Sequence, residues 1–415
     1  MGAVMFETAM FYSFTLTRFT RQLEKSPELI APWLAQENAK NVGGDPITLP
    51  GLTMDSIRLQ LDKCTPTART KHNTGVDKDG RPAGPRAGIY ILANACFPLC
   101  LRTGSMESLE IIIRNIDGKS PALHHYPIAQ RVKYLYYLGR YWFAYNHFGR
   151  AKRVLQEAYI RTPARFQQQR TQILTYLIAS NMTMGLFPSQ ELLQRPEAAS
   201  LRPHFAPIAK AIKQGNLPKF RSLLDPQSAD AADSATANFL FRRNMLIQLK
   251  TRCEILMYRS LFRRVFVLDG FHGDQTTKAA PNFDLGTLRA VIVQLEKRAV
   301  LQSPHSYHHL ADDIDPDFEG SPEEFWTLTK DDNLYGEDED GDEDLPKLAE
   351  VEATATSLIY QGLLHGNIIH RLSKVLITGA RGKNPVEVGF PRVCDIARQL
   401  QDENERVPGW ITTDF

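Results

Sequence analysis

The chain has 415 residues, and 43% of them are hydrophobic, which is enough to form two or three domains or one long helical array. Its five cysteines contain no CxxC pair, which excludes a disulfide-stapled scaffold and argues against a structural zinc site. No run of 18 apolar residues occurs, so we expect neither a membrane-spanning helix nor a membrane partner. We also expect no signal peptide, because the first apolar stretch contains Glu7 and follows no basic cluster.

The formal net charge of +2 conceals a strong asymmetry. Residues 312–350 contain 17 acidic residues and only two basic ones, which leaves 47 basic and 30 acidic residues in the rest of the chain. A body with a net charge of +17 favours a polyanionic partner; a segment that balances charge and maintains solubility is the alternative. Residues 303–350 have few aromatic side chains and contain the run GEDEDGDED, so they are predicted to be a disordered insertion.

The first 238 residues show helical patterns with one interruption. Residues 1–63 are predicted to be N-terminal helices, and residues 64–88, rich in Gly and Pro with almost no large apolar side chain, to be a flexible linker. Residues 89–238 are predicted to form a tetratricopeptide-like helical-repeat array that ends in a loop at 226–238. Its expected helices are separated by Gly, Asn or Pro turns and lie at 89–101, 106–116, 125–146, 148–160, 166–184, 189–194, 204–214 and 216–224.

One segment of this array is especially informative. The sequence AQRVKYLYYLGRYWFAYNHFGRAKRVLQEAYI predicts two helices joined by a tight turn. The second helix carries Ala151, Leu155 and Ala158 at positions i, i+4 and i+7, and its small residues allow close approach of the two helices.

The pattern changes in residues 239–415. Residues 239–268 are predicted to be one long and largely buried helix, followed by a loop at 269–282. We then expect a helix at 283–297 with Asp284 as its N-cap, a helix at 351–368, a strand at 368–378 and a loop or wing tip at GARGKNPVEVG. This order is that of a winged helix, with strands only after about residue 365.

Five segments together resemble the PCI-domain family, whose members occur in the proteasome lid, the COP9 signalosome and a translation-initiation complex. They are RVKYLYYLGRYWFAYNHFGRAKRVLQEAY, RTQILTYLIASNMTMGLFPSQELL, IAKAIKQGNLPKF, RCEILMYRSLFRRVF and SLIYQGLLHGNI, and they span about residues 128–368. The resemblance implies a mainly α fold, in which a helical-repeat array leads through a junction helix into a winged helix at 239–415. The pattern is most similar to the PCI subunit of the nuclear transcription–export complex TREX-2. Two features of this chain differ from the family pattern. The acidic insertion is not part of it, and the N-terminal helical region is shorter than the family pattern implies, so we expect the sequence to be incomplete at its N-terminus.

Function and partners follow as implications of this resemblance. It implies a non-enzymatic scaffold subunit acting in mRNA export and transcription-coupled mRNP assembly, in the nucleus and at or near the nuclear pore. The implied partners are a larger PCI scaffold subunit, a small acidic protein that also occurs in the proteasome lid, and RNA or DNA bound without sequence specificity. A signalosome-associated or splicing-linked PCI subunit is the alternative, because such subunits share much of the pattern.

No catalytic constellation stands out in the sequence. It contains no GxxxxGK[ST], no GxGxxG after a strand, no GxSxG and no HExxH, so we expect neither an enzyme nor a cofactor. His305, His308 and His309 stand beside acidic residues but at the edge of the predicted disordered insertion, so we expect no metal site there.

The candidate nucleic-acid-binding residues are basic and lie on two predicted elements. They are Arg252, Arg259, Arg263 and Arg264 on the long helix, and Arg371, Lys374, Arg381 and Lys383 on the strand and wing.

On a single helix at 100° per residue, Arg252, Arg259 and Arg263 fall within about 40° of one another, so their guanidinium groups could follow a phosphate backbone. Pairing with carboxylates at the domain junction is the alternative for this helix, and a merely solvated loop is the alternative for the wing. The third winged-helix helix, VEATATSLIYQGLLHG, has no Lys or Arg, which argues against reading of bases. We therefore expect contacts to phosphates.

Overall fold

The computed structural model falls into two compact units. Unit 1 comprises Met1–Asn181, Gln194–Leu201 and Gln401–Phe415, and unit 2 comprises Met182–Leu193 and Arg202–Leu400. The boundaries of these units differ from those of the predicted domains. The domain boundaries therefore remain predictions. No helix of the described part has the length and hydropathy needed to cross a membrane. The residues that the structure describes are 2–40, 46–64, 76–77, 79–273, 279–302, 346–400 and 406–412.

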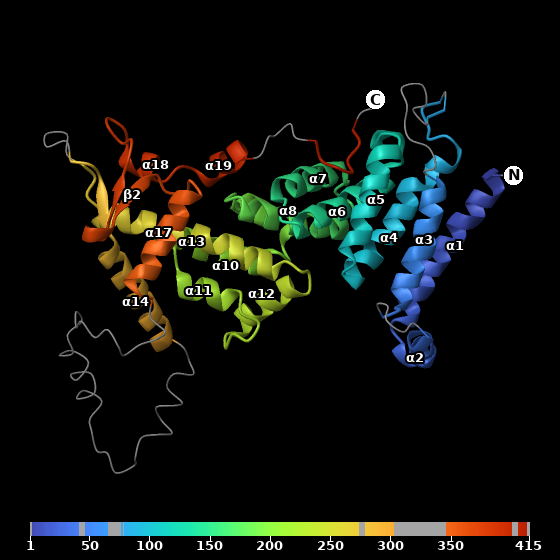
Figure 1. The fold of residues 1–415 in the computed structure, drawn as a ribbon, viewed down its shortest axis with the longest axis horizontal. Helices are drawn as coiled ribbons and strands as arrows, with labels where there is room; N and C mark the ends of the chain where they lie inside the picture. The colour runs from blue at the N-terminus through green and yellow to red at the C-terminus, as the bar shows by residue number, and fades with distance from the viewer. Residues whose placement is uncertain are drawn as a thin grey trace, which may run out of the picture. The chain divides into compact units, whose positions relative to one another are not determined.

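Unit 1 is built mainly from helices (Figure 1). Its longer helices are α1 (Gly2–Leu23), α2 (Ala31–Lys40), α3 (Leu49–Cys64), α4 (Ile89–Thr103), α5 (Met106–Lys119), α6 (Ile128–Ala144), α7 (Phe148–Arg161) and most of α8 (Gln167–Thr183). Its 3-10 turns are η1 (Pro27–Leu29), η2 (Gly84–Gly88), η3 (Leu123–His125) and η4 (Pro196–Ala198).

Part of the predicted flexible linker is ordered in unit 1. Gly88 at the end of η2 is buried, and the backbone carbonyl of Arg86 accepts a hydrogen bond of 2.8 Å from the hydroxyl of Tyr126. Backbone groups buried in this way need partners, and a tyrosine hydroxyl supplies one here. The rest of the predicted linker, residues 65–75 and 78, lies outside the described residues.

Helices α6 and α7 form a tight antiparallel pair. Asn146, with φ of 61°, makes the turn between them, a conformation that asparagine tolerates better than most residues. Ala151, Leu155 and Ala158 are fully buried, which confirms the close approach predicted from their spacing. Gly139 on α6 lies directly against Leu155, and a Cβ atom at Gly139 would stand only 2.4 Å from Leu155 Cγ.

We predict that Gly139→Ala lowers the free energy of unfolding by about 1–3 kcal/mol, because the added methyl overpacks the contact between α6 and α7. Urea denaturation followed by circular dichroism measures the change. In the double variant Gly139→Ala/Leu155→Ala the methyl gains room, so the loss should be smaller than the sum of the two single losses. Strict additivity of the two losses would contradict the contact.

The segment 406–412 folds back onto unit 1. The hydroxyl of Tyr134, fully buried on α6, donates a hydrogen bond of 2.7 Å to the backbone carbonyl of Gly409. Asp117 Oδ1 accepts from the Gly409 amide at 3.0 Å and from Arg406 Nη2 at 2.9 Å. Gly409 has a φ of +85° and its position is crowded by Ile113, so only glycine fits without strain.

Unit 2 begins with five helices, of which the second, third and fourth pack against the fifth. They are α9 (Gln190–Leu193), α10 (Arg202–Gln214), α11 (Leu217–Leu223) and α12 (Ala231–Phe241), followed by α13 (Leu246–Asp269).

Two predictions for this region were wrong. The expected loop at 226–238 contains most of α12, which begins where Asp230 accepts a hydrogen bond from the Ala232 amide. The expected single helix at 239–268 is broken after Phe241, because Asn244 adopts a left-handed conformation with φ of 54°. Alanine is the best helix former, and the four alanines of α12 favour a helix once Asp230 caps it, whereas its Asp, Ser, Thr and Asn residues made the segment look like a loop.

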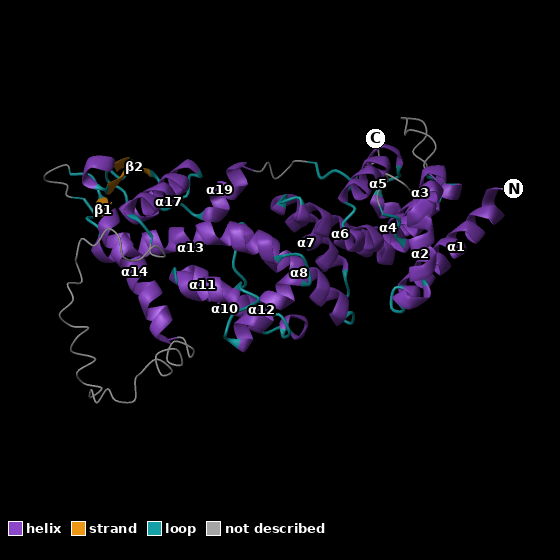
Figure 2. Ribbon diagram, turned by 60° about the horizontal axis from the view of Figure 1, so that its bottom comes forward, coloured by secondary structure: helices purple, strands orange, loops and turns teal. Residues whose placement is uncertain are grey.

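The second half of unit 2 is a winged helix with a small three-stranded sheet. Its strands are drawn in orange in Figure 2. Its sheet has the antiparallel order β1-β3-β2, with β3 in the centre. Its elements after α13 are β1 (Asn282–Asp284), α14 (Leu285–Gln302), α17 (Leu348–Tyr360), β2 (Gly366–Ile369), η5 (His370–Leu372), β3 (Lys374–Ile377), α18 (Pro385–Gly389) and α19 (Val393–Leu400).

The strand predictions need correction. Strand β1 lies before residue 365, where the expected loop at 269–282 meets the expected helix at 283–297, because its three residues become a strand only by pairing with β3. The expected single strand at 368–378 is a hairpin of β2 and β3, and the helix expected to reach 368 ends at Tyr360. The predicted N-cap is confirmed, since Asp284 Oδ2 accepts from the Thr287 amide at 3.0 Å. The fold class, a helical array followed by a winged helix, is confirmed.

The core of the winged helix is aromatic. Phe266 on α13 packs against Phe283 of β1 with ring centroids 5.8 Å apart and against Phe390 at 5.9 Å. Phe262, one turn earlier, lies 6.2 Å from Phe283. Helix α13 therefore serves as the first helix of the winged helix.

The cysteines behave as expected core residues. All five are free, and Cys96 and Cys100 on α4 are fully buried. Burial raises the pKa of the Cys96 thiol well above its ordinary value and that of Cys100 to about 12, so both remain protonated at neutral pH.

Candidate nucleic-acid interface

Arg259 on α13 holds the backbone of the segment after α18. Its Nη2 donates to the carbonyl oxygens of Phe390 at 3.0 Å and Pro391 at 2.6 Å. Burial, reinforced by the charge of Arg263, lowers the pKa of Arg259 to about 10, so the guanidinium is still protonated at neutral pH. Arg259 therefore has a structural role. Its hydrogen-bond partners are backbone carbonyls, whereas the alternative stated above was pairing with carboxylates.

The other arginines of α13 differ in their surroundings. Arg264 is exposed but donates to the Gln214 carbonyl at 3.0 Å, which joins α13 to the end of α10. Arg263 is exposed and forms no hydrogen bond or ion pair with the residues that the structure describes. Arg252 is exposed near the start of α13. Arg252, Arg259 and Arg263 all lie on α13, so the spacing that aligns them along one helix face holds. However, Arg259 and Arg264 donate hydrogen bonds to backbone carbonyls and so stabilise unit 2.

We predict that Arg259→Met lowers the free energy of unfolding by about 1–3 kcal/mol, because two buried carbonyls lose their donor. Arg263→Met, one turn along on the exposed face, is the matched control and should change stability by less than about 0.5 kcal/mol. Chemical denaturation of both variants makes the comparison. Equal effects of the two substitutions would show that Arg259 does not hold this segment.

The structure places Arg371 and Lys374 together at the wing. Arg371 lies in η5, which connects β2 to β3, and Lys374 is the first residue of β3. Ser373 between them has a φ of 46°, and this left-handed residue turns the chain into β3. Both basic side chains are exposed, so they present positive charge at the tip of the hairpin.

Arg381 and Lys383 lie elsewhere. They are exposed in the turn that follows β3 and precedes α18, at the opposite end of β3 from Arg371 and Lys374. Of the segment predicted to be a loop or wing tip, residues 379–384 form the loop after β3, and the second half is α18; the tip of the β2–β3 hairpin lies at η5 instead. Asn384 caps α18 by accepting from the Val386 amide at 3.0 Å, which explains why a helix forms there.

The third helix of the winged helix, α17, presents an acidic rather than a basic surface. Val351, Ala355 and Leu358 are buried in the core, while Glu350 and Glu352 are its only charged residues. Glu352 contacts His370 of η5, so one carboxylate lies beside the wing. Carboxylates at this position repel phosphates and leave no donor for guanine.

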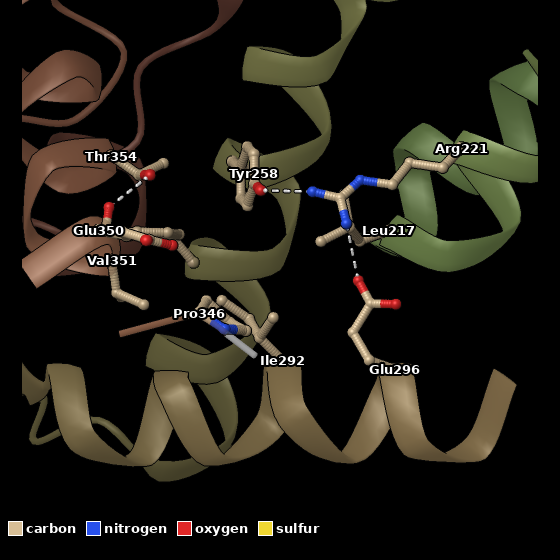
Figure 3. Close-up of a pocket in the computed structure, with 10 residues that line it drawn as sticks. Leu217, Arg221, Tyr258, Ile292, Glu296, Pro346, Glu350, Val351 and Thr354 are labelled. Atoms are coloured by element: carbon tan, nitrogen blue, oxygen red, sulfur yellow. Dashed lines mark hydrogen bonds and ion pairs between the residues drawn. The ribbon is translucent and has the colours of Figure 1, made fainter. Parts of the chain in front are cut away.

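A pocket of about 170 Å³ lies where α11, α13, α14 and α17 meet (Figure 3). Arg221 donates from Nη1 to Glu296 Oε1 at 3.0 Å and from Nη2 to the Tyr258 hydroxyl at 3.5 Å, and it lies 3.9 Å from Glu254. None of the ten residues drawn in Figure 3 is His, Cys, Ser or Lys. The interactions of Arg221 therefore join α11 to α13 and α14.

Metal ligands are not gathered in the described part of the chain. No three His, Cys, Asp or Glu side chains among those residues are placed to hold a metal ion. His305, His308 and His309 lie outside the described residues, as does most of the predicted insertion. Residues 346–350, the last five of the predicted insertion, are described, and residues 348–350 belong to α17. The predicted insertion therefore extended a few residues too far.

Sequence reasoning overlooked a group of basic residues in unit 1. Residues 128–181 contain nine Lys or Arg and a single acidic residue, Glu157. The local charge was visible in the sequence, but only the pairing of α6 with α7 shows which of these side chains share a face.

The chain was compared with protein-family models and with individual known proteins. No protein-family model matches the chain. The chain is similar to PCI domain-containing proteins. One from Schizosaccharomyces pombe is 24% identical over 289 residues, which cover 70% of this chain and 52% of that protein. The PCI domain-containing protein 2 homologue of Drosophila melanogaster is 28% identical over 187 residues, 45% of this chain and 44% of the relative.

A second kind of relative also occurs. A CSN12 homologue of Gibberella zeae is 29% identical over 201 residues, which cover 47% of this chain and 41% of that protein. The chain thus spans about half the length of the curated relatives that it matches. These likenesses support the resemblance to the PCI-domain family that the sequence segments indicated.

Proposed function

We propose that the chain is a non-enzymatic PCI scaffold subunit of the TREX-2 complex, acting in mRNA export and transcription-coupled mRNP assembly. The observation that carries this proposal is a helical array that runs through α13 into a winged helix, in a chain similar to PCI domain-containing protein 2 homologues. The pocket in Figure 3 supports the scaffold role, since Arg221 of α11 pairs there with Glu296 of α14 and so joins the two helices.

Contact with RNA or DNA is proposed to run through phosphates at the wing. Arg371 and Lys374 are exposed and adjacent, whereas α17 offers Glu352 where a base-reading helix needs donors. A surface of this kind attracts the nucleic-acid backbone and does not distinguish sequences.

The proposed partners and location complete this picture. They are a larger PCI-containing scaffold subunit, a small acidic protein of the proteasome-lid type, and the nucleus at or near the nuclear pore. The net charge of +17 outside the acidic segment suits an acidic protein and a nucleic acid equally.

A signalosome-associated PCI subunit is the second candidate. It is supported by the likeness to the CSN12 homologue, whose identity of 29% is similar to that of the PCI domain-containing protein 2 homologues. Affinity purification of the tagged chain from nuclear extract, with identification of the co-purifying PCI subunit, separates the two. Signalosome subunits in place of the export scaffold would contradict the TREX-2 proposal.

We predict that Arg371→Glu/Lys374→Glu weakens binding to unrelated RNA and DNA sequences by similar factors, about tenfold or more. The slope of log affinity against log salt should shrink by about 1.4–1.8, because two phosphate contacts are lost. Fluorescence anisotropy with the co-purified PCI partner present measures both quantities.

The matched control is Lys297→Glu/Arg298→Glu on α14, which makes the same change of charge on two exposed residues away from the hairpin. It should bind nearly as wild type does. Wild-type binding by the wing variant would remove the wing from the interface, and a loss confined to one sequence would favour base reading instead.

A further inference from the structure

The first helix of unit 1 exposes aromatic side chains on the face that points away from the core. Helix α1 lies at one edge of unit 1 and packs against α3 (Figure 1). Its inner face carries Ser13 and Thr20, both buried, and the Thr20 hydroxyl lies 2.7 Å from that of Thr53 on α3. On the outer face, Phe11 and Phe14 are 74% and 46% exposed. Apolar surface that is rimmed by polar residues in this way marks a place of interaction with another molecule.

The two phenylalanines belong to a regular row that we call the α1 outer stripe. It consists of Glu7, Phe11, Phe14 and Arg18, and all four residues are exposed. At 100° per residue, they lie within about 60° of one another, and the buried face that packs on α3 lies about 140° away. Steps of four, three and four residues are the spacing with which one helix packs along another.

The two ends of the stripe carry opposite charges. Glu7 and Arg18 lie about 16 Å apart along the helix axis, with the phenylalanines between them. Neither charged side chain forms a hydrogen bond or an ion pair with the residues that the structure describes. The stripe therefore has an apolar centre, one negative end and one positive end.

The spacing of the stripe is the same in both directions along the helix. In two antiparallel α1 helices with a twofold axis between positions 12 and 13, Phe11 of one copy faces Phe14 of the other. In that register Glu7 faces Arg18, and each contact occurs twice, as an isologous interface requires. A parallel pair in register would place Glu7 beside Glu7 and Arg18 beside Arg18, where like charges repel. The row thus complements a second copy of itself in one orientation.

We propose that two copies of this chain associate through their α1 outer stripes as an antiparallel helix pair. Phe11 and Phe14 expose roughly 180–300 Å² of aromatic surface per copy, or about 360–600 Å² in the pair. Together with the side chains that flank them, this approaches the ~1,000 Å² of a small specific interface, so the dimer is a weak and transient one. The charged ends select the orientation and the register.

The test uses the purified full chain in sedimentation velocity experiments. An interface of this size gives a dissociation constant in the micromolar range, so the chain should sediment as a monomer at about 1 µM and mainly as a dimer at about 100 µM. Phe11→Gln/Phe14→Gln removes the apolar centre of the stripe and should raise the dissociation constant about tenfold or more. Circular dichroism checks that the variant keeps its helix content.

The matched control is Tyr12→Gln/Phe19→Gln, which makes a similar change on the same helix. These two rings are 58% and 61% exposed, and they lie about 110–130° from the centre of the stripe. The control should therefore dimerise within about twofold of wild type. Equal weakening by the two double variants would show unspecific apolar association and would overturn the proposal.

Exchange of the charges tests the register without changing the apolar surface. Glu7→Arg and Arg18→Glu each place like charges opposite one another, so each should raise the dissociation constant about threefold or more. Glu7→Arg/Arg18→Glu exchanges the two ends and should restore dimerisation to within about twofold of wild type. A mixture of the two single variants should form heterodimers, because each charge then faces its opposite. These differences should shrink in 1 M salt, where the Debye length is about 3 Å.

Three further outcomes would overturn the proposal. Wild type that remains monomeric at about 100 µM has no such interface. Dimers that persist in Phe11→Gln/Phe14→Gln associate through another surface. Failure of Glu7→Arg/Arg18→Glu to recover what the single variants lose would exclude the antiparallel register. The experiment needs only the chain itself, so its outcome is independent of the proposed role in mRNA export.

Discussion

The packing of α13 against the winged helix is the contact on which unit 2 depends. Phe262 and Phe266 enter an aromatic cluster with Phe283 and Phe390, so one helix face closes the core of the sheet. The same helix packs on α10, and Arg264 bonds the end of that helix. Arg259 then fixes the chain that leaves α18. The direction of the wing is therefore set by a helix that also belongs to the array.

The sequence predicted helices α4–α8 well because residues that disfavour continuation of a helix separate them. Gly104 takes a left-handed conformation after α4, and Asn146 does so after α6. Where tertiary contacts decide the structure, the prediction failed. Three residues, Asn282–Asp284, become strand β1 only because β3 lies beside them, and no local pattern of that length could reveal it.

The candidate interface shows the same division between local and distant causes. Helical periodicity correctly aligned Arg252, Arg259 and Arg263, since their angles depend on spacing alone. It could not show that Arg259 bonds Phe390 and Pro391, about 130 residues later in the chain. Likewise the charge of residues 128–181 was present in the sequence, but the folding of α7 onto α6 is what places Arg161 beside Arg131.

The return of segment 406–412 to unit 1 has a consequence for synthesis on the ribosome. Tyr134 and Asp117 acquire their partners at Gly409 only after the whole of unit 2 has been translated. At about 5–20 residues per second, the roughly 200 residues that intervene delay this closure by about 10–40 seconds. During that interval the Tyr134 hydroxyl and the apolar surface around Ile113 have no cover from this segment.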